Sequence, residues 1–259
     1  MTPPRVLITG ASSGIGAALA REYVRRGAML GLVARRAPAL QQLAEALGSR
    51  SCVYQADVRD ARSMKDVAAD FVARHGGADV VIANAGVSAG TLTEHGEDHE
   101  VFREIMDINV LGMVHTFSPF LPGMRAARSG TLVGIASVAG VRGLPGAGAY
   151  SASKSAAITY LESLRVETRG SGVRVLTIAP GYIDTPMTER NPYPMPFMLP
   201  AEVAARRMIE AIERARPYTV VPWQMGLVAL GLRALPRWAY DRLFARAPHK
   251  PRRTRGSAS

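Results

Sequence analysis

Tyr150 and Lys154 are the pair of residues in this sequence best suited to chemistry. The segment around them is predicted to be a helix, in which side chains four residues apart leave the same face. A lysine ammonium favours the phenolate, so its proximity lowers a tyrosine pKa from about 10 toward the range of an acid/base catalyst. Exposed pairs on surface helices have the same spacing, so the interpretation depends on the surrounding chain.

Ser137 is the second candidate, because it ends a predicted strand over residues 130–137. A flexible loop, residues 141–148, then leads to Tyr150, and both side chains are expected to reach one pocket. No histidine is placed to activate the serine as a nucleophile, so a hydrolase triad is poorly supported.

A glycine turn follows the first predicted strand, residues 5–9, and opens a helix that continues to Arg26. Free amide groups and the helix dipole converge at such a turn and make an anion site. Glycine at Gly10, Gly14 and Gly16 removes each Cβ that would obstruct the turn or a pyrophosphate. The GxxxGxG spacing meets the general dinucleotide fingerprint only approximately, and a turn without ligand is the alternative.

The second predicted strand, residues 28–33, ends at Ala34-Arg35-Arg36. An acidic residue usually stands here in NAD-selective folds, whereas an arginine accommodates the 2′-phosphate of NADP. Ala34 occupies the position of the acid, and a guanidinium is well shaped for phosphate. We therefore expect NADP(H), with two solvated arginines as the alternative.

Further apolar strands are predicted over residues 51–56, 78–83, 173–179 and 218–221, with helices between them. This alternation predicts right-handed βαβ crossovers and a parallel sheet, with ligands at the carboxyl ends of the strands. We expect a Rossmann-type, doubly wound α/β fold with about seven strands and helices on both faces.

The composition favours one folded domain and excludes several kinds of site. A chain of 259 residues with 47% hydrophobic residues can form a large core. Its one cysteine, Cys52, excludes an internal disulfide and a cysteine-rich metal site, and is expected to be a buried thiol. His95 and His99 lack a third ligand, so no metal is expected. The first residues enter a strand without room for a signal peptide, which favours the cytoplasm.

The net charge of +11 is concentrated toward the C-terminus. An arginine-rich surface can reflect genomic composition alone. Alternatively, the excess of basic residues near the C-terminus contacts an acidic membrane surface. Residues 223–247 are expected to form a helical extension, whose apolar run stops at Arg233, short of the roughly 20 residues that span a bilayer. This extension either packs over the pocket or a subunit interface, or rests on anionic lipid. No nucleic-acid-binding module surrounds it, and residues 248–259 are expected to be disordered.

Taken together, the motifs resemble the short-chain dehydrogenase/reductase family over about residues 5–222. The resemblance depends on residues that occur in the order of the family: Thr9-Gly-Ala-Ser-Ser-Gly-Ile-Gly16, Asp57, Asn84-Ala-Gly86, Asn109, Ser137, Tyr150-x-x-x-Lys154 and Pro180-Gly181.

The resemblance implies a role for each of these residues. Tyr150 would be the general acid, with Ser137 on the same substrate oxygen, Lys154 on the nicotinamide ribose, and Asn109 positioning a water that relays protons to the lysine. The residues implied in cofactor binding are Thr9, Gly10, Ser12, Ser13, Gly14, Ile15 and Gly16 near the pyrophosphate, Arg35 at the 2′-phosphate, Asp57 and Val58 at the adenine, Asn84, Ala85 and Gly86 beside the adenosine, and Pro180, Gly181, Ile183 and Thr185 toward the nicotinamide.

The sequence therefore predicts one catalytic domain, residues 1–222, that transfers hydride between NADP(H) and a carbonyl or secondary alcohol. The apolar residues in segment 182–199 favour a lid over an apolar substrate, with an ordinary packed loop as the alternative. A membrane-surface acyl-ketone reductase and a non-catalytic NADP-binding regulator remain as alternative functions. The resemblance also implies a homodimer or homotetramer formed through the helices of Asn109 and Tyr150.

Overall fold

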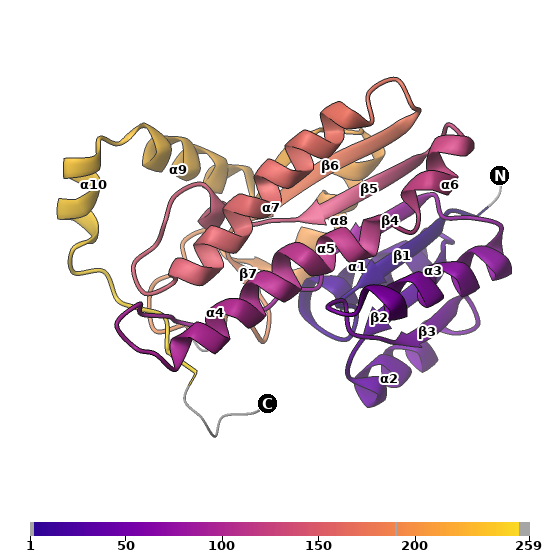
Figure 1. Cartoon of the computed structure of the whole chain (residues 1–259), viewed down its shortest axis with the longest axis horizontal. Coiled ribbons are helices and arrows are strands. Elements are labelled where there is room, and N and C mark those ends of the chain that lie inside the picture. The colour runs from indigo at the N-terminus through magenta and orange to yellow at the C-terminus, as the bar shows by residue number, and fades with distance from the viewer. Residues whose placement is uncertain (1–2, 190, 254–259) are drawn as a thin grey trace.

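A single parallel sheet organises the chain (Figure 1). The computed structural model describes residues 3–189 and 191–253. The strand order of this sheet is β3-β2-β1-β4-β5-β6-β9. Its strands are β1 (Arg5–Thr9), β2 (Met29–Ala34), β3 (Ser51–Gln55), β4 (Val80–Ala83), β5 (Gly130–Ile135), β6 (Val173–Pro180) and β9 (Tyr218–Val221). The doubly wound sheet of seven strands expected from the sequence is confirmed.

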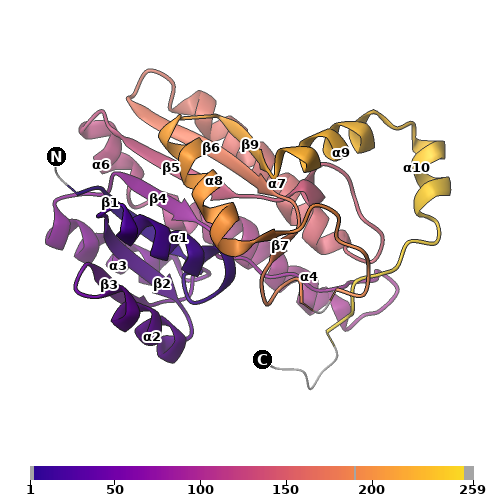
Figure 2. The same ribbon diagram turned by 180° about the vertical axis from the view of Figure 1, so that it is seen from behind.

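Helices cover both faces of the sheet, as Figures 1 and 2 show from opposite sides. One face carries α1 (Gly14–Arg25), α2 (Ala37–Leu47) and α8 (Ala201–Glu213). The other carries α3 (Ala61–His75), α5 (Gly112–Phe117), α6 (Leu121–Ala126) and α7 (Gly148–Glu167). Because each central strand is buried on both sides, its apolar residues run almost without interruption.

The strand order reverses between β1 and β4. The chain passes outward from β1 through β2 to β3, and then returns to place β4 on the other side of β1. Such a reversal leaves a crevice at the carboxyl ends of the strands, where ligands bind in open α/β sheets. Thr9 and Asn84 stand at the two sides of this crevice.

The long helix expected over residues 101–117 is present but is not uniform. It comprises α4 (Asp98–Met106), a π-helical turn η1 (Asp107–Leu111) and α5. Single π-helical turns within α-helices are frequent at functional sites. Asn109 lies within the π-helical turn and is 1% exposed.

Cys52 differs from its expected burial. It lies on β3, the edge strand of the sheet, and is only partly buried, with its sulfur 3.7 Å from His75 Nε2. An edge strand has a neighbour on one side only, so its residues stay closer to solvent.

Two helices follow the sheet and project from one end of the molecule (Figure 1). Helix α9 (Trp223–Ala234) packs through Met225 and Ala229 against Val138. Helix α10 (Arg237–Phe244) is joined to the loop after β5, where Tyr240 Oη donates a hydrogen bond to the Gly143 carbonyl. None of the described helices combines the length and apolar character needed to cross a membrane.

The basic tail, expected to be disordered over residues 248–259, is described as far as Arg253. Residues 248–253 follow α10 and contact the loop before α4, where Gly90 N donates to the Pro251 carbonyl at 2.9 Å. This pairing joins positions that lie far apart in the sequence, so local composition does not predict it. Residues 254–259 lie outside the described residues.

Candidate active site

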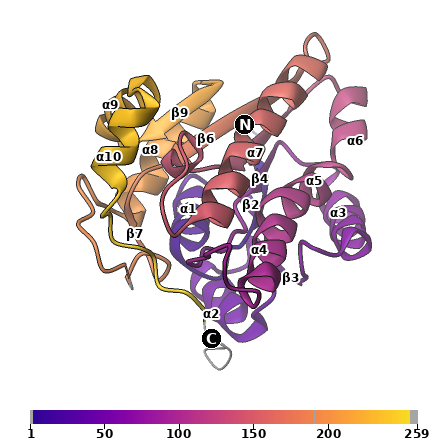
Figure 3. The same cartoon turned by 60° about the vertical axis from the view of Figure 1, so that its left-hand side comes forward.

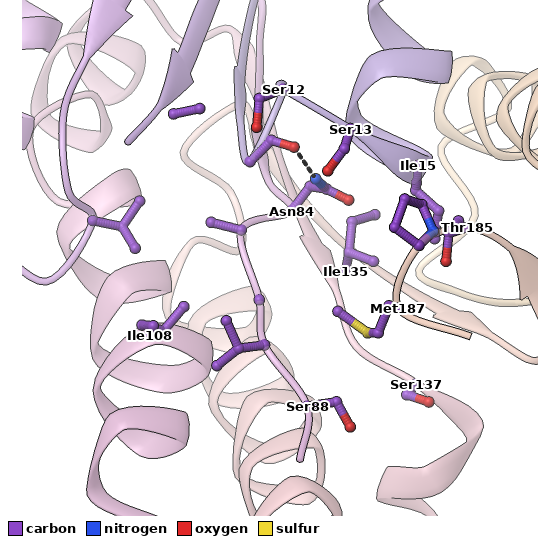
Figure 4. A pocket seen from close by; sticks show the side chains of 18 of the residues that line it. Ser12, Ser13, Ile15, Asn84, Ser88, Ile108, Ile135, Ser137, Thr185 and Met187 are labelled. Atoms are coloured by element: carbon purple, nitrogen blue, oxygen red, sulfur yellow. Dashed lines mark hydrogen bonds between the residues drawn. The ribbon is translucent and has the colours of Figure 1, made fainter. Parts of the chain in front are cut away.

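A cleft of about 640 Å³ opens at the carboxyl ends of the strands (Figure 4). Its wall includes most of the residues singled out in the sequence: Gly10, Ser12, Ser13, Gly14, Ile15, Arg35, Asp57, Val58, Asn84, Ala85, Gly86, Ser137, Tyr150, Lys154, Pro180, Gly181, Ile183 and Thr185. Thr9, Gly16 and Asn109 stand behind this wall.

The glycine turn has no room for larger side chains. A Cβ at Gly16 would overlap the Gly10 carbonyl oxygen and lie 2.7 Å from Asn84 Nδ2. Gly10 and Gly14 have positive φ angles of 66° and 53°, which favour glycine. The Ser13 side chain makes no capping hydrogen bond to α1, so the first amide groups of the helix stay available to an anion.

Thr9 and Asn84 fix the turn to the end of β4. Asn84 Nδ2 donates to the carbonyl oxygens of Thr9 at 2.9 Å and Gly10 at 3.2 Å. Thr9 Oγ1 accepts from the amides of Asn84 and Ala85, both at 3.2 Å. These bonds join both sides of the crevice, so the anion site is preformed.

Arg35 and Arg36 follow β2 and both line the cleft. Arg36 Nη2 lies 3.0 Å from Ser13 Oγ and 3.3 Å from Ser12 Oγ, and so reaches across to the glycine turn. From the sequence, phosphate binding is expected of Arg35 alone. The two consecutive arginines were the available signal for Arg36, but only the structure shows which one faces the turn.

Asp57 and Val58 occupy the same side of the cleft. Burial acts to raise the pKa of Asp57, but hydrogen bonds from Arg59 outweigh it and the pKa is lowered. The Asp57–Arg59 ion pair spans 2.6 Å. The carbonyl of Val58 accepts from His115 Nδ1 at 2.9 Å, which gives that histidine a packing role.

The other end of the cleft brings together Ser137, Tyr150 and Lys154, as their strand and helix were expected to do. Ser137 Oγ accepts from the Ala139 amide at 3.1 Å and can donate to the Pro180 carbonyl at 3.4 Å. Lys154 is 4% exposed, and its Nζ donates to the Ile135 carbonyl at 2.8 Å. The hydroxyl of Ser137, the phenol of Tyr150 and the ammonium of Lys154 thus lie together in one partly buried site.

The pKa values of the two ionisable groups follow from burial. Desolvation raises the pKa of Tyr150, and its hydrogen bond with Ser137 acts in the opposite direction. The expected lowering by Lys154 is therefore not the net result. Burial lowers the pKa of Lys154 itself from 10.5 to about 8.

Asn109 lies behind the catalytic candidates. Its Oδ1 accepts from the Val87 amide at 2.8 Å, and its Nδ2 donates to the Val87 carbonyl at 3.0 Å and to Ser153 Oγ at 2.9 Å. The polar atoms of this buried amide are thus paired with the strand-end loop and with α7. The side chain holds together the two segments that flank the cleft.

Some residues that sequence reasoning missed also line the cleft. Ser88 Oγ is buried there and has no hydrogen-bond partner among the described residues. Figure 4 shows it with Ser137 at the end away from Ser12 and Ser13. A buried hydroxyl without a partner fits a site that a polar ligand completes. Arg253, from the tail, lines the cleft as well.

Comparison with known proteins identifies relatives of this chain. The family model described as short chain dehydrogenase matches residues 4–194. An uncharacterized oxidoreductase of Myxococcus xanthus is 41% identical over 238 residues, which are 91% of this chain and 94% of that protein.

Solved structures show the same fold. A short chain dehydrogenase/reductase of Burkholderia phymatum, in complex with NAD, has a TM-score of 0.82 and 25% identity, and the match covers 97% of this chain and 98% of that chain. An alcohol dehydrogenase of Thermococcus sibiricus, complexed with 5-hydroxy-NADP, has a TM-score of 0.75 and 26% identity, with 85% and 96% covered. The relatives thus include proteins with either type of nicotinamide cofactor.

Proposed function

The chain is an oxidoreductase of the short-chain dehydrogenase/reductase family, and from this premise we propose that it transfers hydride between NADP(H) and a carbonyl or secondary alcohol on a largely apolar substrate. The observation that carries the proposal is the convergence of Ser137, Tyr150 and Lys154 on a cleft that begins at the glycine turn. The cleft provides both an anion cradle and an acid within one cavity, as such a reaction requires.

The nicotinamide supplies the hydride when it is bound. Tyr150 protonates the substrate oxygen as negative charge develops there, and Ser137 donates a second hydrogen bond to the same atom. Lys154 holds a positive charge at the side of the phenol and offers donors to ribose hydroxyls. Asn109 keeps α7 and the Val87 loop in register and positions a water on the proton path to Lys154.

Residues of the glycine turn bind the pyrophosphate, and Arg35 and Arg36 hold the 2′-phosphate of NADP(H). Two features support this choice of cofactor. Ala34 leaves no carboxylate at the end of β2, and Arg36 already lies against Ser12 and Ser13. Asp57 and Val58 flank the adenine, Asn84 to Gly86 line the adenosine side, and Pro180, Gly181, Ile183 and Thr185 approach the nicotinamide.

The substrate is proposed to be apolar because of the segment after β6. Tyr182 packs beside Val138 and Met225, and its ring centroid lies 6.5 Å from that of Tyr193. Met187 lines the cleft, while Phe197 and Met198 are exposed nearby in sequence. An irregular apolar segment at the substrate end is suited to a lid.

Replacement of Tyr150 by Phe tests the proposal. Turnover should fall by a factor of about a thousand or more, in the upper range for loss of a general acid, while NADPH affinity changes little. Near-normal turnover in Tyr150→Phe would remove the tyrosine from its role. Tight NADPH binding by the unaltered protein, with no turnover of aliphatic ketones, acyl-ketones or steroids, would favour the alternative of a non-catalytic regulator.

A second candidate, reduction of acyl-ketones at a membrane surface, is favoured by the outer face of α9. Trp223, Leu227 and Leu230 follow one another at helical spacing and are 65%, 61% and 66% exposed. Arg233 follows in the last turn of α9, and Arg237 begins α10. Apolar residues bordered by arginines match the chemistry of an anionic lipid interface on the cytoplasmic side.

The enzyme is further proposed to form a homodimer or homotetramer through the helices of Asn109 and Tyr150. Phe102 on α4, Leu111 on η1 and Val166 on α7 are 42%, 49% and 60% exposed. Large apolar side chains on neighbouring helices are suited to a subunit interface. Light scattering of the unaltered protein and of Leu111→Asp would measure the oligomer and test the contribution of this face.

A further inference from the structure

The tail residues Ala247–Arg253, here called the C-terminal strap, run from α10 toward the loop before α4 (Figures 1 and 3). Arg253, at the end of the strap, lines the cleft. The amide of Gly90 donates to the Pro251 carbonyl at 2.9 Å, and Gly90 pairs with Arg252 in a parallel β-bridge. The strap thereby adds backbone of the C-terminus to a loop near the active site.

Ion pairs anchor the end of the strap. Arg252 lies 2.8 Å from both Asp98 and Glu97, and Arg253 pairs with Glu104. Asp98 is 2% exposed and also accepts from the Leu92 amide at 2.8 Å. Hydrogen bonding by Arg252 is the main cause that lowers the pKa of Asp98. A buried carboxylate with a bidentate guanidinium partner makes a specific attachment.

Two glycines make room for the strap. A Cβ at Gly90 would overlap the carbonyl oxygen of Lys250. Gly146 has a φ of +70°, and a Cβ there would lie 2.6 Å from the Cβ of His249. These two loops are joined to each other by the bridge between Thr91 and Ala147, and their backbone shapes fit the strap closely.

This attachment holds Lys250 beside the catalytic tyrosine. Lys250 Nζ lies 5.8 Å from the centroid of the Tyr150 ring, the same distance as Lys154 Nζ. Lys250 is partly buried, and burial lowers its pKa from 10.5 to about 8, so the amine still carries its charge near neutral pH.

Lys250 differs from its neighbours in its ion pairing. Arg252 and Arg253 each face a carboxylate, but no carboxylate among the described residues pairs with Lys250. Desolvating an ammonium without an anion is costly. A ligand that brings a negative charge to this position would offset that cost.

We propose that Lys250 determines substrate specificity by binding a carboxylate that lies a few bonds from the reacting carbonyl, so that the preferred substrates are oxo acids or hydroxy acids with an apolar chain. The inference depends on the proposed function for the carbonyl, whose oxygen faces Ser137 and Tyr150. The carboxylate then meets Lys250 from the strap, and the apolar chain lies under the segment after β6.

Binding of octanoate and octanamide tests this directly, because the two share one chain and differ in charge. Titration calorimetry is carried out on the full-length protein with and without NADP⁺. The unaltered protein and Lys250→Arg should bind octanoate about tenfold more tightly than octanamide, as expected for a charge-assisted hydrogen bond. Lys250→Met should bind both equally. Lys65→Met, the same exchange on the exposed side of α3, should retain the preference.

Gly90→Ala provides a second test that leaves every charge in place. Its new methyl group displaces the strap, so the preference for octanoate should fall as in Lys250→Met. Equal affinities in the unaltered protein, or a preference that survives in Lys250→Met, would overturn the inference. Tighter binding of both probes by Lys250→Met would also overturn it, since the strap would then act as an obstruction.

The result of this binding test is independent of the proposed function, because octanoate has no ketone group to reduce. Oxidation of NADPH with an oxo-octanoate and with its methyl ester measures the reaction itself. Turnover of the ester alone would contradict the role of Lys250 and leave the reductase intact. Octanoate preference without turnover of either compound would support Lys250 and contradict the reductase.

Discussion

Asn109 holds the backbone of Val87 at two points, accepting from its amide at 2.8 Å and donating to its carbonyl at 3.0 Å. Asn109→Ala would leave both groups without these partners at a site that is 1% exposed. We expect the free energy of unfolding to fall by about 2–4 kcal/mol, since each buried unsatisfied group costs roughly 1–3 kcal/mol. Urea unfolding followed by circular dichroism measures the loss.

Ser153→Ala is the matched comparison for this prediction. It removes one bond to Asn109 and leaves the clamp on Val87 in place. A loss of about 1 kcal/mol is expected for it. An equal or greater loss in Ser153→Ala would show that the Val87 contacts contribute little.

The sequence predicts those parts of the site whose position depends on a neighbouring strand or helix in the chain. The glycine turn, Ser137 and the Tyr150 helix each follow a strand or open a helix, and parallel strands carry their following loops to one edge. Their meeting in one cleft is therefore a consequence of the fold class. Which of Arg35 and Arg36 reaches the glycine turn cannot be predicted from the neighbouring sequence, because it depends on where Ser12 and Ser13 lie relative to β2.

The strap and the tyrosine pKa could not be predicted for a related reason. Residues 97–98 and 252 are separated by more than half the chain, and their ion pairs form only after α10 has turned the tail back. The pKa of Tyr150 depends on desolvation, which spacing in the sequence does not report. Both features belong to tertiary packing.

The second prediction concerns the choice of cofactor. Arg36→Ala removes the guanidinium beside Ser12 and Ser13, and Arg35→Ala removes its neighbour. Each should raise the Michaelis constant for NADPH about tenfold or more, the usual effect of losing a charge-assisted phosphate contact, and change that for NADH little. Arg62→Ala, which removes an exposed arginine at the start of α3, is the control. An unchanged NADPH/NADH ratio in both variants would favour solvated arginines.

The third prediction uses the lowered pKa of Lys154. Its folded-state pKa of about 8 lies below its ordinary value of 10.5, so the unfolded chain binds the extra proton more readily between these values. The destabilisation is complete below about pH 8 and is relieved as the pH rises toward 10.5. Lys154→Met should be more stable than the unaltered protein near neutral pH. Its advantage in free energy of unfolding should shrink by about 2 kcal/mol between roughly pH 7.5 and 10.

Lys65→Met controls for a lysine that stays exposed on α3. Urea unfolding of the three proteins over the same pH series, in the absence of nucleotide, provides the comparison. An advantage of Lys154→Met that grows with pH would mean that Lys154 is stabilised as a cation, contrary to its burial.

The last prediction concerns the exposed stripe on α9. Leu227→Asp combined with Leu230→Asp places two charges where an anionic bilayer would receive apolar side chains. Sedimentation with vesicles of equal phosphatidylglycerol and phosphatidylcholine should show binding by the unaltered protein and a loss of about tenfold or more in the double variant, since burying one leucine contributes roughly 1.5–3 kcal/mol. Val72→Asp, at an exposed apolar position of α3, should bind as the unaltered protein does. Equal sedimentation of the double variant would assign the stripe to a contact between protein chains.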